Sequence, residues 1–406
     1  MIRHRRPADP DARLRAVHSV IADPADQTSV LPLVQAVEDP SLDVARAALR
    51  RLATLAGPTE TAMLRDRLLD LDIGLVGDVA ATLVKLSDRD AVDVVVAGLR
   101  FGSPMRRHKA ALAARELRAP SARHALLQAL ADVTTPVRRV ALEALSRLPP
   151  DAQTVSAARR CLRDRDAAVR SAAIGAVAAL DRDAAQTLAT LVVDAEPRVR
   201  TALAAAAANL DADTIITLLG DEEPGVRQQT LRTLSRKPRP GVGRSLNHAL
   251  TDANWHVRRA ACDAIAAART PNAASVLITA LIDSHPAVRG RALVALEQLL
   301  GPQLDPTLEQ ALDEAPPQLR RTLIEILGHH QRTAAVLRFA ADPAVLVRLA
   351  VVHALSGEPS DEARTALDRL RYDHDRSVRH AAAGSIARVR PRAGRGSPRA
   401  DPRGSG

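Results

Sequence analysis

The sequence predicts an all-α fold in which one helical hairpin is repeated along most of the chain. Apolar residues make up 46% of the 406 residues but aromatic residues only 1%, so the core consists of Ala, Leu and Val. Ala and Leu favour helices, and Ala lets helix axes approach closely. A short motif also returns about every 31 residues, and the apolar positions around it recur at helical spacing. Together these observations argue against a β-sandwich or a β-barrel.

The repeated motif is an Asp, four variable residues and Val-Arg, followed by an Ala and then an apolar residue on the same helical face. Upstream the motif decays: the unit around Val44 has lost its Arg, the unit around Val76 lacks both partners, and the register at 106–107 is ambiguous. A truncated first unit begins near Leu14-Arg15. We therefore expect twelve or thirteen units in all. Nine units are near-complete, and each carries the motif Val or, in one copy, a Leu. These residues are Val137, Val169, Val199, Val226, Val257, Val288, Leu319, Val347 and Val378.

Each unit contains two short helices, as residues 121–148 illustrate. We expect the first helix over residues 122–131 and the second over residues 136–148. The connection between them offers N-cap hydroxyls at Thr134 and Thr135, and a proline in the first turn, where its missing N–H costs nothing. The residues that mark the buried stripe of the second helix are Val137, Ala141, Ala144, Leu145 and Leu148.

The Asp-x4-Val-Arg-x2-Ala-x3-Leu pattern resembles the HEAT repeat, in particular the short HEAT-like repeat named after phycobilisome lyases. The resemblance covers about 380 of the 406 residues. It implies a right-handed α-solenoid in which each hairpin contacts only its neighbours and the second helices line a concave surface. In this family the corresponding Asp and Arg form a ladder of hydrogen bonds between adjacent repeats. We expect a basic segment at residues 1–10, the solenoid over residues 11–389, and a disordered Arg/Gly/Pro-rich tail at residues 390–406.

The formal net charge of +10 is concentrated outside the predicted solenoid. Residues 1–6 carry three Arg and no acid, and residues 390–406 carry five Arg and one Asp, which leaves +3 for the remainder. A nucleic-acid binder usually concentrates its basic charge on a folded face, so this distribution argues against that class. Contact with nucleic acid or another polyanion is expected to be weak and to use the Arg-rich tail.

Several features of the sequence predict a cytoplasmic protein with no membrane partner, and we expect it to be a monomer. No uncharged stretch approaches the roughly 20 residues of a transmembrane helix, and no apolar segment follows the basic N-terminus as it would in a signal peptide. Cys161 and Cys262 lie 101 residues apart. We interpret both as small core residues, which fits a reducing compartment.

Candidate contact residues stand where the repeat leaves a position free. The second and sixth positions after the motif Val should face outward from the second helix, on the side that the family resemblance makes concave. A basic cluster over residues 106–109 and the single Trp also stand out, although a solvated face and a plug between repeats remain alternatives for these two features. The candidate partner-binding residues are Arg46, Arg50, Arg106, Arg107, Lys109, Arg139, Arg232, Trp255, His256, Arg259 and Arg321.

The sequence carries none of the catalytic motifs sought. Gly-x-Ser-x-Gly, Cys-x-x-Cys, His-Glu-x-x-His and P-loop patterns are all missing, and His248, His256 and His285 lack the spacing of a zinc site. We expect no catalytic residue, cofactor or metal.

The expected function is therefore a non-catalytic scaffold that binds a protein partner, an acidic protein being one candidate, through its concave surface. Two alternatives stay open. A nucleic-acid-associated HEAT-like protein would need aromatic residues for base stacking, which are scarce here, and a bilin lyase-like protein would handle a chromophore.

Overall fold

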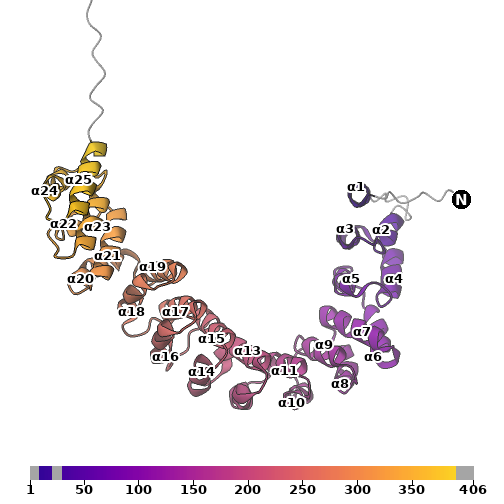
Figure 1. The fold of residues 1–406 in the computed structure, drawn as a ribbon. Helices are drawn as coiled ribbons and strands as arrows, with labels where there is room; N and C mark the ends of the chain where they lie inside the picture. The colour runs from indigo at the N-terminus through magenta and orange to yellow at the C-terminus, as the bar shows by residue number, and fades with distance from the viewer. Residues whose placement is uncertain (1–8, 21–29, 390–406) are drawn as a thin grey trace, which may run out of the picture. The chain divides into compact units, whose positions relative to one another are not determined.

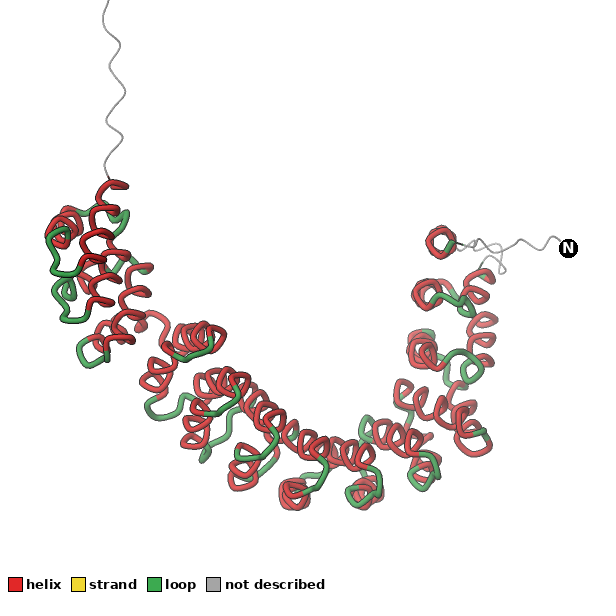
Figure 2. The backbone as a smooth tube through the Cα atoms, viewed as in Figure 1, coloured by secondary structure: helices red, strands yellow, loops and turns green. Residues whose placement is uncertain are grey.

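The computed structural model describes residues 9–20 and 30–389, with side chains described up to residue 386. These residues form helices joined by short loops, and no strand occurs among them (Figure 2). The chain divides into two compact units, Met1–Thr233 and Leu234–Gly406. The predicted tail at residues 390–406 and most of the predicted N-terminal segment lie outside the described residues.

The described residues of the first unit form fifteen α-helices, of which the last extends across the boundary with the second unit. Figure 1 labels most of these helices. Short 3₁₀ turns, η1 (Pro120–Ala122), η2 (Thr190–Val193) and η3 (Ala207–Asn209), extend some of them. The α-helices are α1 (Pro10–Ser19), α2 (Leu31–Ala36), α3 (Leu42–Leu55), α4 (Pro58–Arg67), α5 (Ile73–Lys85), α6 (Ala91–Phe101), α7 (Pro104–Leu117), α8 (Arg123–Ala129), α9 (Thr135–Leu145), α10 (Ala152–Cys161), α11 (Ala167–Leu180), α12 (Ala184–Ala189), α13 (Pro197–Ala205), α14 (Ala212–Leu219) and α15 (Pro224–Arg236).

The second unit continues the same alternation of a short first helix and a longer second helix. Its 3₁₀ turns are η4 (Ala249–Thr251), η5 (Ala280–Ile282) and η6 (Gly301–Gln303). Its α-helices are α16 (Gly243–His248), α17 (Trp255–Ala268), α18 (Ala273–Thr279), α19 (Pro286–Leu300), α20 (Leu304–Leu312), α21 (Pro317–His329), α22 (Thr333–Leu337), α23 (Val345–Leu355), α24 (Asp361–Leu370) and α25 (Arg376–Val389).

Each unit is built of two layers of helices. In the first unit the second helices α1, α3, α5, α7, α9, α11 and α13 each pack on the next, and the first helices α2, α4, α6 and α8 form the other layer. In the second unit α17 packs on α19, α21 on α23 and α23 on α25. These second helices thus pack on the second helices of adjacent hairpins, which is the arrangement of a repeat solenoid. The predicted all-α solenoid fold is confirmed.

The repeat at residues 121–148 shows how closely the sequence predicts a hairpin. All five residues of its expected buried stripe are at most 4% exposed. The first helix α8 ends at Ala129 and the second helix α9 at Leu145, each earlier than expected. Two prolines, Pro149 and Pro150, follow α9, and a chain leaves helical geometry before a proline. Cys161 and Cys262 are buried in the core, as expected.

A ladder of hydrogen bonds joins adjacent hairpins, as the family resemblance implies. Arg138 donates from Nε and Nη2 to the two carboxylate oxygens of Asp164, both at 2.9 Å, and from Nη1 to the carbonyl oxygen of Asp132 at 2.9 Å. Asp164 Oδ1 also accepts the N–H of Asp166 at 2.9 Å. Each Arg therefore clamps the turn of its own hairpin to the turn of the next. Equivalent ion pairs are Arg107–Asp132, Arg170–Asp194, Arg200–Asp221, Arg258–Asp283, Arg320–Asp342 and Arg348–Asp373.

The ladder settles two uncertain registers of the N-terminal region. Arg107, not Arg106, is the ladder residue of α7, because it binds Asp132 through Nε and Nη2. In the first repeat of the chain, the motif register placed at Leu14-Arg15 is wrong. Arg13 binds both oxygens of Asp39, at 2.8 and 3.1 Å, whereas the Arg15 side chain is 74% exposed.

Candidate functional site

The free positions of the second helices reach the surface in both units. Arg46 and Arg139 are half-buried, and Arg50, Arg259 and Arg321 are exposed. The motif residue two positions before Arg46, Arg139, Arg259 and Arg321 is buried in each case, so these side chains stand on the other side of the helix. The surface of the second helices is therefore where this fold offers variable side chains.

Charges on this surface of the first unit are largely paired with one another. Arg46 Nε lies 3.1 Å from Asp78 Oδ2, and Arg139 Nη1 lies 2.5 Å from Glu143 Oε1. Glu143 also accepts from Arg115 of the preceding repeat at 2.9 Å. Exposed ion pairs of this kind contribute about 0–1 kcal/mol each to stability. Their effect here is to neutralise the surface.

The predicted basic cluster at residues 106–109 is engaged inside the fold. Arg106 Nη1 lies 2.6 Å from Asp70 Oδ1, and Arg107 belongs to the ladder. Lys109 Nζ donates to the carbonyl oxygen of Leu71 at 2.5 Å. Burial and the nearby Arg139 lower the pKa of His108, so its imidazole is neutral at pH 7. These contacts leave little free positive charge in the cluster.

Trp255 packs between two repeats of the second unit. Its ring centroid lies 3.9 Å from that of His285, with the planes 5° apart, and 3.6 Å from that of His256. At the matching positions in the first unit, Thr135 Oγ1 donates to Asp166 at 2.9 Å. The stack therefore replaces a hydrogen bond between successive turns, and it accounts for Trp255 within the fold. His256 stays exposed at its outer side.

The remaining predicted contact residues differ in how free they are. Arg50 and Arg259 are exposed and have no ion-pair partner among the described residues. Arg321 pairs with Glu325 of its own helix at 2.8 Å, and Arg232 is exposed on α15. Within each unit the predicted residues lie on several different helices.

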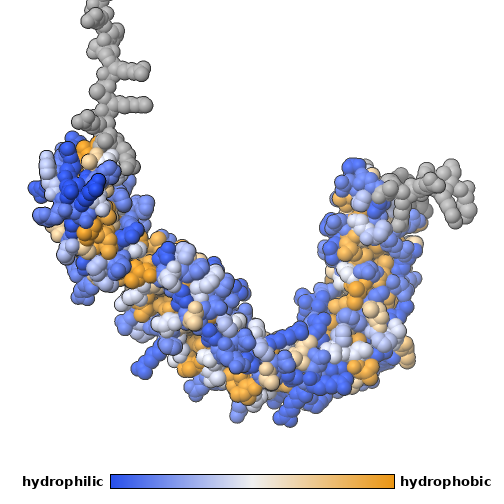
Figure 3. All heavy atoms as spheres, in the orientation of Figure 1, coloured by the Kyte–Doolittle hydropathy of each residue, from blue (hydrophilic) through white to orange (hydrophobic). Residues whose placement is uncertain are grey.

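Three exposed apolar side chains lie outside the set of predicted contact residues. Phe101 is 85% exposed, Met105 56% and Val133 76%. They flank two successive inter-helix turns that Arg107 joins, since it binds both Asp132 and the carbonyl oxygen of Gly102. A signal was available, because Phe101 stands where the motif has its Asp. Figure 3 shows such apolar side chains (orange) reaching the surface between polar ones.

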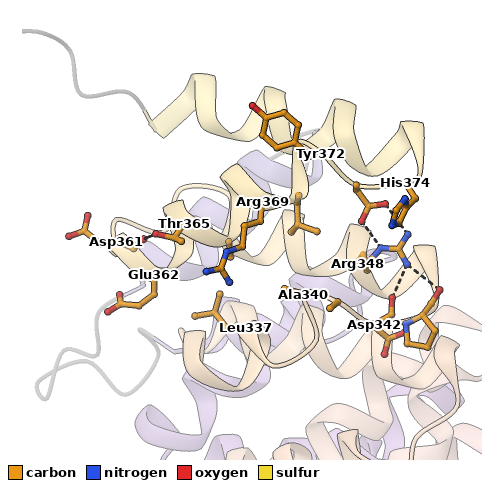
Figure 4. A pocket seen from close by; sticks show the side chains of 15 residues that line it. Leu337, Ala340, Asp342, Arg348, Asp361, Glu362, Thr365, Arg369, Tyr372 and His374 are labelled. Atoms are coloured by element: carbon orange, nitrogen blue, oxygen red, sulfur yellow. Dashed lines mark hydrogen bonds and ion pairs between the residues drawn. The ribbon is translucent and has the colours of Figure 1, made fainter.

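A groove of the second unit lies beside α24 and has a volume of about 1050 Å³ (Figure 4). It arises because α22 has only five residues and leaves α24 partly uncovered. The ladder pair of Arg348 and Asp373 closes one end, and Arg369 extends across the opening. Tyr372, 82% exposed, stands at the rim. The repeat pattern of the sequence does not predict this groove.

Three observations bear on metal binding, thiol chemistry and membrane insertion. Within the described ranges, no three His, Cys, Asp or Glu side chains gather as a metal site would require. Burial raises the pKa of Cys262 to about 12, so this thiol is protonated at neutral pH. No described helix has the length and apolar character needed to cross a bilayer.

Comparison with known families agrees with the geometry. A family model for HEAT repeats matches residues 125–209, 212–303 and 304–387, which is more than half of the chain. The chain belongs to the HEAT-repeat family. The degenerate repeats before residue 125 lie outside the match, although the structure continues the same hairpins there. None of the curated proteins matches the sequence of this HEAT-repeat chain.

Several solved structures resemble this HEAT-repeat chain at low sequence identity. An engineered protein is 16% identical with a TM-score of 0.33, and the match covers 89% of this chain and 99% of that one. Kap121p is 15% identical with a TM-score of 0.41 (94% and 49% covered), and yeast importin-β, Kap95p, is 11% identical with a TM-score of 0.45 (93% and 63% covered). The chain thus spans about half the length of Kap121p. Scores at this level do not identify a partner or an activity.

Proposed function

We propose that this HEAT-repeat chain is a non-catalytic scaffold that binds a protein partner through its second-helix surface and the adjoining inter-helix turns. The observation that carries the proposal is the exposure of Phe101, Met105 and Val133 on two joined turns. Aromatic and Met side chains are enriched where proteins bind one another. No contact inside the described chain requires these three side chains to be apolar.

The distribution of charge supports a protein partner over a polyanion. Arg106, Arg107 and Lys109 are satisfied by Asp70, Asp132 and backbone carbonyl groups. A phosphate backbone would have to compete with these contacts. The unpaired Arg50 and Arg259 favour a partner that presents acidic groups near them. We expect the chain to act as a cytoplasmic monomer in this role.

The test is co-purification from native lysate of the source cell with the full chain as bait. Samples with and without nuclease, and a bait ending at Val389, separate a protein partner from a polyanion held by the tail. A bait carrying Phe101→Ser and Val133→Ser tests the apolar turns. Val193→Ser is the matched control, because Val193 is also an exposed Val of an inter-helix turn, at 81%.

We expect a partner that resists nuclease, remains with the shortened bait and with Val193→Ser, and falls at least tenfold with the double variant. Loss of all retained protein on nuclease treatment or on tail removal would contradict the proposal. Equal retention of the partner by the double variant and by the control would show that the partner does not bind these turns.

A further inference from the structure

An internal position of the ladder in the second unit, Arg289, lacks its carboxylate among the described residues. Arg258 donates from Nη1 to the carbonyl oxygens of its own turn, at 2.8 and 3.2 Å, and from Nε and Nη2 to Asp283 at 2.7 and 2.8 Å. Arg289 repeats the first half of this pattern, binding the carbonyl oxygens of Asp283 and Ser284 at 2.8 and 3.2 Å. Within the part of the chain that the structure describes, no carboxylate meets its Nε and Nη2.

The missing carboxylate has a cause in the sequence of the next turn. Ladder Asp residues elsewhere accept the N–H of the residue two positions ahead, as Asp283 does from His285 at 2.8 Å. Here the motif position is Glu314, and the residue two positions ahead is Pro316, which has no N–H to donate. Glu314 is exposed, and the neighbouring Asp313 pairs with Arg338 at 2.5 Å. Neither carboxylate reaches Arg289.

The helices on either side of this gap enclose a groove. Among the described helices, α19 and α21 are not packed along each other as α17 and α19 or α21 and α23 are. A hollow of about 480 Å³ lies here, lined by Arg289, Gly290 and Leu293 of α19 and by Ile326 of α21. A Cβ atom added at Gly290 would meet nothing within 4 Å.

We infer that this groove binds an acidic segment of a protein partner, whose Asp or Glu carboxylate completes the ladder at Arg289. The two carbonyl groups hold the guanidinium as they do at Arg138, Arg258 and Arg348, where it also binds a carboxylate, so little side-chain entropy is lost on binding. An aliphatic residue beside the carboxylate packs on Leu293 and Ile326, which are half-buried. Arg321 at the groove edge already pairs with Glu325, so Arg289 supplies the recognition charge. The inference rests on the proposed scaffold function, since the occupant is a protein.

The probe is a displayed library of random dodecapeptides, selected against the full chain and against Arg289→Gln. Arg379→Gln is the matched control, because Arg379 Nη1 binds two carbonyl oxygens of its own turn, at 2.8 and 2.9 Å, and has no carboxylate partner among the described residues. Gly290→Leu is a second variant that fills the groove. It removes a helical glycine, so it should not destabilise the fold.

We expect peptides recovered on the natural chain and lost on Arg289→Gln to carry an Asp or Glu beside an aliphatic residue. Synthetic peptides from this set should bind about tenfold or more weakly to Arg289→Gln, to Gly290→Leu, and when their own acid is changed to the amide. Binding to Arg379→Gln should be unchanged, and circular dichroism should show all variants folded.

The inference is overturned if no peptide depends on Arg289, if the dependent peptides lack an acid, or if Arg379→Gln weakens binding as much. The scaffold proposal is judged separately by the lysate experiment. A nuclease-resistant partner that tolerates Arg289→Gln would leave that proposal standing and remove this groove as its site.

Discussion

Removal of Asp164 should strongly destabilise the hairpins that it joins. The side chains of Arg138 and Asp164 are only 6% and 13% exposed, and Asp164→Ala would leave Arg138 Nε and Nη2 buried without acceptors. Breaking a buried pair by removing one partner costs about 3–5 kcal/mol. The exposed pair of Arg46 and Asp78, with side chains 43% and 46% exposed, should cost about 0–1 kcal/mol when broken.

Cys161 provides a local assay for this prediction. It is 9% exposed at the end of α10, three residues before Asp164, whereas Cys262 is fully buried in the other unit. Thiol labelling under native conditions reports how often each site opens. A loss of about 3 kcal/mol should speed labelling of Cys161 about 150-fold, while Cys262 keeps its rate.

The double variant Arg138→Met with Asp164→Ala distinguishes the cost of an unpaired buried guanidinium from the cost of losing the ion pair itself. It should recover much of the stability, because no unpaired buried charge remains. The reasoning is refuted if Asp164→Ala speeds labelling of Cys161 no more than Arg46→Ala does. It is equally refuted if the double variant labels as fast as the single one.

Two further predictions concern acid stability and the aromatic stack. Burial opposes ionisation of Asp164 but hydrogen bonds outweigh it, and the hydrogen bond from its Arg partner dominates at Asp283, so the pKa of both carboxyls lies below its usual value. A carboxyl whose pKa is lowered in the folded state stabilises the fold fully above its unfolded pKa of about 3.9, and this stabilisation is lost as pH falls through the folded pKa. Circular dichroism should therefore show a constant helix content from pH 7 to about 5 and unfolding below about 4. Unfolding already near pH 6 would contradict this cause. His285→Ala should lower the free energy of unfolding by about 1 kcal/mol, because it removes the stacked ring and the acceptor for the N–H of Ala287. It should also shift the fluorescence emission of Trp255 to longer wavelengths, because the indole loses the ring that covers it. Unchanged emission would show that the stack does not shield the indole.

The sequence predicted most of the fold because each hairpin depends only on local information. The motif, its period and the Ala-rich stripe are all contained within one unit and its neighbour, so a reader of the sequence can place Val137 in the core and pair Arg138 with the next Asp. The prediction weakened where the motif had decayed. There the choices between Arg106 and Arg107, and between Arg13 and Arg15, depended on which guanidinium reaches the following turn.

The candidate site depended far more on tertiary structure. Lys109 is basic in the sequence, but whether its charge is free was decided by carbonyl groups about 40 residues earlier in the chain. Arg289 lacks a carboxylate partner among the described residues because Pro316 cannot donate the hydrogen bond that anchors a ladder carboxylate, whereas the groove lies where α19 and α21 are not packed along each other. The sequence by itself determined the repeating hairpin and its ladder, because these are short-range and periodic. Only the packing of hairpins determined which charges are neutralised, which apolar side chains remain exposed and where a groove opens, because these properties belong to pairs of surfaces.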